Sequence, residues 1–158
     1  MNKILVLVHP GSACGSATSN IGRQSANEAR DGLCHELRTW TGGVIVLDGE
    51  LSDELPSYPE LQSQIDAAVQ RAASAGQVSI RRMADDPDQV DEIKRIINEL
   101  GTHTAAYVVT GAWYQSNDGG GCVGSVLDAL RGAGSDAELS DYAIDIDCEQ
   151  EEEYDEES

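Results

Sequence analysis

The sequence of 158 residues contains no phenylalanine, and its aromatic side chains are five tyrosines and two tryptophans. No stretch approaches the roughly 18 uninterrupted apolar residues that a membrane-spanning helix needs. The apolar residues near the start run directly into His9 and Pro10, without the apolar core and cleavage pattern of a signal peptide. These absences predict a soluble, cytoplasmic protein that does not insert into a membrane.

Spacings typical of metal sites are also missing. The four cysteines lie far apart in the sequence: Cys14, Cys34, Cys122 and Cys148. They form no CxxC pair and no Cys/His pattern that would bind zinc, so we expect reduced thiols. Asp48, Glu50 and Asp53 could hold Mg²⁺ or Ca²⁺ loosely through oxygen, but no histidine accompanies them. The sequence therefore predicts no transition-metal site and no cofactor.

Positive charge is scarce. Ten Lys and Arg residues face 29 Asp and Glu residues, the formal net charge is -19, and Lys3 and Lys94 are the only lysines. A surface of this sign repels phosphate backbones, so direct binding of nucleic acid is not expected. Seven of the 29 acids lie in the last ten residues, which predicts an acidic, disordered tail over 148–158. The remaining acidity fits a halophile's solvating surface, an ordinary acidic protein or a mimic of nucleic-acid charge.

Short apolar runs rich in branched residues alternate with segments whose apolar residues recur at helical spacing. The runs predict strands over 3–8, 44–47, 77–81 and 105–110, and a last strand within 137–146. The spacing predicts helices over 25–40, 59–75, 88–100 and 123–131. Strands that alternate with helices indicate a parallel sheet covered on both faces. We therefore predict a three-layer, Rossmann-like α/β fold with a mostly parallel sheet, in one domain over 1–147.

The carboxyl ends of parallel strands meet at one edge of the sheet, where open α/β folds bind their ligands. This rule gathers His9, Asp48, Arg81 and Cys122 at that edge. Cys122 opens a predicted helix, where unpaired backbone N–H groups and the helix dipole favour the thiolate over the thiol. This placement makes Cys122 a candidate nucleophile. The alternative is a buried cysteine that only fills space, because cysteine is among the most buried residue types.

A series of short motifs occupies residues 78–147. The motifs are Ile80-Arg81-Arg82, Glu99-Leu100-Gly101, Val108-Val109-Thr110-Gly111, Ala112-Trp113, Cys122-Val123, Leu127-Asp128-Ala129-Leu130 and Asp141-Tyr142-Ala143-Ile144-Asp145. Their order resembles that of the isochorismatase-like cysteine hydrolases, which include nicotinamidases and related amidases. That family has a strand with a catalytic lysine, an apolar strand that ends in Thr-Gly, a Cys-Val pair that opens a helix, and a later strand with an acidic end.

The resemblance implies hydrolysis of a small amide or a related substrate, with Cys122 as the nucleophile. It also implies that Arg81 or Arg82 takes the place of the lysine that supports the anionic intermediate. Gly121 and Trp113 would then lie beside the oxyanion and the substrate.

Three features depart from the family pattern. Where the family has an aspartate as the general base, this sequence has His9, which could take the thiol proton as histidines do in unrelated cysteine proteases. The loop over 114–121 is longer than its counterpart in the family. An arginine, moreover, balances an anion but does not donate its proton as a lysine can.

Two other functions fit the sequence. Because two of the three catalytic residue types differ from those of the family, the chain could be a catalytically silent relative that binds a protein or a small ligand. The loop over 9–20 could instead cradle a phosphate at the start of the next helix, as in flavodoxin-like domains that bind flavin. The expected partner is a small molecule in most of these cases, and the sequence leaves open whether the chain forms a homo-oligomer.

Overall fold

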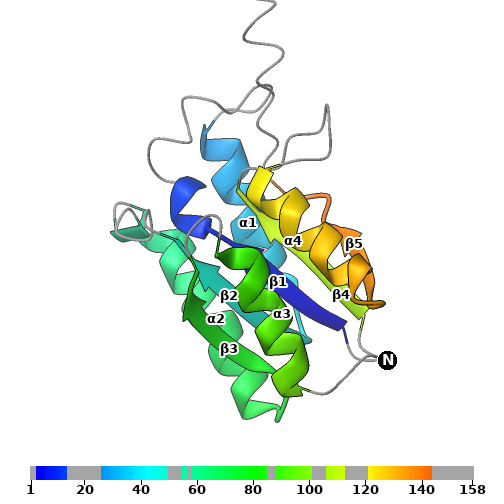
Figure 1. Cartoon of the computed structure of the whole chain (residues 1–158). Helices are drawn as coiled ribbons and strands as arrows, with labels where there is room; N and C mark the ends of the chain where they lie inside the picture. The colour runs from blue at the N-terminus through cyan, green and yellow to red at the C-terminus, as the bar shows by residue number, and fades with distance from the viewer. Residues whose placement is uncertain are drawn as a thin grey trace, which may run out of the picture.

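The computed structural model describes residues 3–13, 26–49, 55–56, 58–84, 88–100, 106–112 and 121–143. Within these ranges strands and helices alternate along the chain (Figure 1). The strands are β1 (Lys3–Val8), β2 (Gly43–Asp48), β3 (Ser79–Met83), β4 (Ala106–Gly111) and β5 (Asp136–Leu139). The helices are α1 (Ala26–Thr39), α2 (Pro59–Ser74), α3 (Gln89–Leu100) and α4 (Gly121–Gly132), with a 3-10 turn, η1, at Pro10–Ala13. No helix in these ranges is long and apolar enough to cross a lipid bilayer.

The five strands of the described residues pair in parallel, in the order β3-β2-β1-β4-β5. The central strands β1, β2 and β4 are mostly apolar and almost entirely buried, as their continuous apolar runs predict. Val6 of β1 lies opposite Ile45 of β2 on one side and Val109 of β4 on the other. The predicted three-layer, Rossmann-like α/β fold is confirmed.

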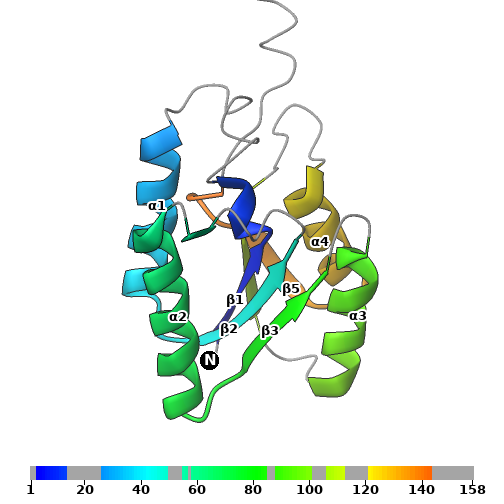
Figure 2. The ribbon, with the colours of Figure 1, turned by 90° about the vertical axis from the view of Figure 1, so that its left-hand side faces the viewer.

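Helical layers cover both faces of the sheet (Figure 2). Helices α1 and α2 pack on the face that Leu5 and Leu7 of β1 present, whereas α3 and α4 pack on the face of Ile4 and Val6. Right-handed crossovers explain this division. The chain moves outward from β1 through β2 to β3 and then returns to the other side of β1 for β4 and β5, so its helices change face. The point of return between β1 and β4 is the topological switch point, where open α/β sheets bind ligands.

The strand order also bears on the flavodoxin-like alternative. The order 3-2-1-4-5 matches the first five strands of dinucleotide-binding folds, whereas flavodoxin-like domains have the order 2-1-3-4-5. The topology of this sheet therefore gives no support to a flavodoxin-like domain.

The last strand is shorter than the resemblance implies. β5 ends at Leu139, and Ser140 begins a turn in which the backbone N–H of Ala143 donates to the Ser140 carbonyl and that of Tyr142 donates to the Ser140 hydroxyl. These local hydrogen bonds replace strand pairing, so the interpretation of 141–143 as part of a strand is wrong. Residues beyond 143, including the predicted tail over 148–158, lie outside the described residues.

Gly111 lies opposite Val8 at the carboxyl end of the β1–β4 pair and has a φ of 123°. A Cβ atom at this position would lie 2.1 Å from the carbonyl oxygen of Val8, closer than nonbonded atoms can approach. Only glycine fits here, because it has no Cβ and tolerates a positive φ. The next residue, Ala112, donates its backbone N–H to the Val8 carbonyl at 3.1 Å. Gly111 therefore keeps β4 paired with β1 up to the edge of the sheet.

We expect Gly111→Ala to lower the free energy of unfolding by about 3 kcal/mol, because the added methyl group clashes with Val8 and strains the backbone. Urea denaturation measures the loss. Gly132→Ala is the matched control, since a Cβ atom there meets nothing within 4 Å and alanine is favoured over glycine in a helix by about 0.5–1 kcal/mol. Equal stability of the two variants would contradict this account of Gly111.

Candidate functional site

His9 directly follows β1 and has an unusual backbone. Its φ is 47°, in the left-handed region that residues other than glycine seldom occupy. Its backbone N–H donates to the Leu47 carbonyl at 2.8 Å, and its ring Nε2 lies 2.6 Å from the carbonyl oxygen of Ala84, which follows β3. The residue is only 6% exposed. His9 thus ties together the carboxyl ends of β1, β2 and β3.

The hydrogen bond to Ala84 decides which ring nitrogen of His9 could act as a base. A carbonyl oxygen only accepts, so Nε2 must carry a hydrogen and donate it. In the neutral ring the available lone pair is then on Nδ1. Gly49 lies against the ring, since a Cβ atom at Gly49 would be 2.8 Å from Cδ2 of His9. The imidazole is therefore held in one tautomer and one orientation.

Asp48, the last residue of β2, is bound by Arg81 of β3. Nε of Arg81 donates to Oδ2 of Asp48 at 2.8 Å, and Nη1 donates to Oδ1 of Asp66 on α2 at 3.0 Å. Burial lowers the pKa of Arg81, but the hydrogen bonds and charges of Asp48 and Asp66 together outweigh burial and raise the pKa above its ordinary value. The Arg81 guanidinium is thus fixed between two carboxylates on the α2 side of the sheet.

Arg82 points to the opposite face, because neighbouring residues of a strand alternate. There Nη1 and Nη2 donate to the two carboxylate oxygens of Glu99 on α3, each at 2.7 Å, and Nη1 also donates to Glu92 at 3.0 Å. Glu99 and Glu92 raise the pKa of Arg82, and Arg82 in turn lowers the pKa of Glu99. Arg82 therefore connects β3 to α3, as Arg81 connects it to α2.

Two of the four acidic partners of the arginines, Asp66 and Glu92, were not among the residues singled out from the sequence, and Glu99 was named only as part of a motif. Glu92 and Glu99 are seven residues apart on α3, and a spacing of two helical turns places them on one face. That periodicity is the signal from which an acidic face could have been predicted. It does not say which strand the face meets, so the pairing with Arg82 follows only from the packing.

Cys122 is the second residue of α4, which begins before the predicted start at 123. Its thiol is outside any disulfide, is partly buried, and packs against the core on the α3–α4 side. Because α4 follows β4, Cys122 lies at the carboxyl edge beside the switch point. Gly121 opens the helix, and the first turn presents backbone N–H groups that stabilise an anion. Trp113 lies outside the described residues.

The predicted site residues thus lie at one edge of the sheet, but their side chains point in different directions. His9, Asp48 and Arg81 are linked, because Ala84 accepts from the His9 ring while its N–H donates to the Asp48 carbonyl at 2.7 Å. The His9 ring extends toward β3, and Cys122 lies past the end of β4. The side chains of Arg81 and Arg82 leave the edge for opposite faces of the sheet.

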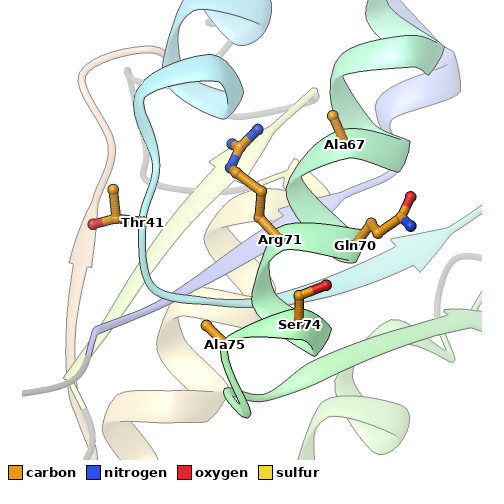
Figure 3. A pocket seen from close by; sticks show the side chains of 6 residues that line it. All are labelled: Thr41, Ala67, Gln70, Arg71, Ser74 and Ala75. Atoms are coloured by element: carbon orange, nitrogen blue, oxygen red, sulfur yellow. The ribbon is translucent and has the colours of Figure 1, made fainter.

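A hollow lies near the amino ends of β2 and β3, away from the residues described above (Figure 3). It is an open groove of about 630 Å³, lined by Thr41, Ala67, Gln70, Arg71, Ser74 and Ala75. Arg71 is already engaged there, since its Nη2 donates to the carbonyl oxygens of Leu37 at 2.6 Å and Trp40 at 3.2 Å. These bonds satisfy carbonyls at the end of α1. The groove is at the opposite edge of the sheet from His9 and Cys122 and adds no chemistry to them.

Comparisons with protein-family models, with curated proteins and with solved structures found no match. The chemistry of the carboxyl edge is therefore inferred from its own residues. The strand order and the two helical layers support the fold class independently of any relative.

Arg81→Met leaves the carboxylate of Asp48, whose side chain is 12% exposed, without its guanidinium. We expect the free energy of unfolding to fall by about 2 kcal/mol, since a largely buried charge loses its hydrogen-bonded partner. Lys94→Met is the control, because Lys94 is exposed on α3 and surface substitutions usually change stability by less than about 0.5 kcal/mol. Urea denaturation at constant salt compares the variants, and equal losses would argue against the role assigned to Arg81.

Proposed function

We propose that this protein is a cysteine hydrolase that cleaves a small amide or a related substrate, with Cys122 as the nucleophile. The observation that carries the proposal is the position of Cys122 in the first turn of α4, beside the switch point. A thiol there meets backbone N–H groups and the positive end of the helix dipole, which favour the thiolate. The motif order that resembles the isochorismatase-like hydrolases points to the same residue.

In the proposed reaction, the Cys122 thiol gives its proton to a base, and the thiolate attacks the carbonyl carbon of the substrate. The carbonyl electron pair moves to oxygen, and backbone N–H groups at the start of α4 hold the oxyanion. Collapse of this intermediate expels the amine, which takes the proton from the base. Water then hydrolyses the thioester, releasing the acid and regenerating the thiol.

His9 is the proposed base, and in this proposal a water molecule carries the proton from Cys122 to it, because the His9 ring extends toward β3 and Cys122 lies past the end of β4. Its Nδ1 carries the lone pair, and its ring is held by Ala84 and Gly49, much as a third group orients the histidine of a catalytic triad. Arg81 and Arg82 are assigned a structural role here, because each guanidinium is bound by two carboxylates. The oxyanion is therefore stabilised by backbone N–H groups in this proposal, without a guanidinium.

A second candidate is a catalytically silent protein of the same fold that binds its partner at this edge. The ion pairs of Arg81 and Arg82 favour it, since they leave neither cation to balance an anionic intermediate. Under either candidate, we propose that the ligand is a small molecule and that the protein is cytoplasmic. A formal net charge of -19 disfavours nucleic acid because it repels the phosphate backbone.

The first test is the pKa of the Cys122 thiol, obtained from the rate of alkylation against pH after Cys14, Cys34 and Cys148 are replaced by alanine. We expect a value below the reference of about 8.5, because the start of a helix stabilises the thiolate. The same protein with Cys122→Ser is the control and should not be alkylated. A thiol pKa at or above the reference would remove the basis of the hydrolase proposal.

His9→Gln tests the base, because glutamine keeps an N–H donor for the Ala84 carbonyl but has no imidazole. We expect hydrolysis of small amides to slow by about 100-fold, the usual contribution of a general base. His35→Gln, on the exposed side of α1, is the control and should leave the rate unchanged. A low thiol pKa at Cys122 without turnover of any amide in a panel would favour the silent-binding candidate.

A further inference from the structure

Glu36 is a carboxyl group buried on the α1 face of the sheet, apart from the residues of the proposed reaction. It belongs to α1, and only 7% of the residue is exposed. The Ser140 hydroxyl donates to its Oε2. Ser140 directly follows β5, and its backbone N–H donates to the Val109 carbonyl at 2.9 Å. Glu36 therefore joins α1 to Ser140–Ala143, the segment that we call the 140–143 turn.

The 140–143 turn also rests on α1 through Tyr142. The ring centroid of Tyr142 lies 5.5 Å from that of His35, and a Cβ atom at Gly32 would lie 3.3 Å from its Cδ1. The backbone N–H of Tyr142 donates to the Ser140 hydroxyl at 2.9 Å. Because that hydroxyl accepts from the turn and donates to Glu36, the conformation of the turn depends on the carboxyl group.

Two buried oxygens beside this link have no hydrogen-bond partner among the described residues: Oε1 of Glu36 and Oγ1 of Thr110. Thr110 is fully buried on β4, and its hydroxyl lowers the pKa of the Glu36 carboxyl. The hydroxyls of Ser140 and Thr110 lower the pKa of Glu36, so hydrogen bonding alone would favour the carboxylate. Burial and the surrounding charges oppose this effect.

The charged groups that act on Glu36 do not favour its ionised form. Asp141, from the 140–143 turn, has the same sign, and His35, from α1, has the weaker influence of the two. Burial raises the pKa of Glu36 above its ordinary value of 4.5, and the opposing effects of Ser140 and Thr110 do not cancel this increase. The folded protein therefore holds this proton more tightly than the unfolded chain does.

We propose that Glu36 and the 140–143 turn form a pH-sensitive latch, in which the protonated carboxyl holds the turn on α1 and its ionisation releases the turn. Release moves a buried negative charge away from Asp141 and into water, where a carboxylate is far more stable. It also uncovers Gly32 of α1, against which the ring of Tyr142 lies. The latch thus makes access to the carboxyl edge from the α1 side depend on pH, whether or not Cys122 is a nucleophile.

Proton binding fixes the direction of the pH dependence. Between the pKa in the unfolded chain, near 4.5, and the higher pKa in the folded protein, the folded state keeps a proton that the unfolded state has lost. The stability that the neutral carboxyl contributes is therefore complete below the lower pKa. It declines as the pH rises and is lost above the higher pKa.

Glu36→Gln tests the latch in the full chain, because glutamine resembles the neutral carboxyl and cannot ionise. The readout is hydrogen exchange at the amides of Tyr142 and Ala143, which donate to the hydroxyl and the carbonyl of Ser140. In the wild type, protection corrected for intrinsic exchange should fall as the pH rises above 4.5, by up to about tenfold per pH unit in the titrating window. In Glu36→Gln it should stay constant.

Two control variants separate the latch from other titrations. Glu60→Gln removes a negative charge from the exposed side of α2 and should keep the pH dependence of the wild type. His35→Gln removes the histidine that contacts Tyr142, and the loss of protection should persist without it.

Either of two results overturns the latch: constant protection in the wild type, or a pH-dependent loss that persists in Glu36→Gln. If Glu36→Gln fails to fold, the titration of the Glu36 carboxyl carbon by NMR in the wild type decides. A midpoint above 4.5, with a matching shift of the Tyr142 amide, is expected, and a midpoint at or below 4.5 contradicts the proposal.

Discussion

Burial of β1 on both faces is the constraint on which the rest of the structure depends. A strand that is apolar on both sides needs a helical layer over each face. The chain runs outward from β1 to β3 on one side and continues through β4 and β5 on the other, and crossovers in these opposite directions supply the two layers. The same arrangement creates the switch point between β1 and β4. Gly111 keeps these strands paired up to that point, because no side chain fits against the Val8 carbonyl. The burial of β1 on both faces therefore explains both the core and the position of the candidate site.

Scarcity of positive charge shapes the polar groups around this core. Arg81 and Arg82 on the edge strand β3 each bind carboxylates from a different helical layer, so the fold itself uses both of these cations. An anion at that edge must then rely on backbone N–H groups, which is what the start of α4 offers beside Cys122. Glu36 shows another effect of this scarcity of positive charge. Burial and the nearby Asp141 raise the pKa of this carboxyl, so the folded protein favours its protonated form more than the unfolded chain does.

The sequence predicted the fold more fully than the site. Continuous apolar runs and helical spacing correctly placed every strand and helix of the described residues, because burial on two faces or on one stripe leaves a periodic signature. The end of β5 was the exception, since Ser140 bonds locally to Tyr142 and ends the strand. For the site, chain order placed His9 and Cys122 at the carboxyl edge, as it must in a parallel sheet. It did not show the direction of a single side chain.

The sequence by itself determined the order of the elements, the class of fold and the edge at which the polar residues gather. The tertiary structure decided the tautomer of His9, the partners of the arginines and the burial of Glu36. Those properties depend on residues far apart in the chain, since Ala84 lies 75 positions after His9 and Ser140 lies 104 positions after Glu36. Local periodicity tells which face of an element is buried, but only packing determines which atoms that face meets.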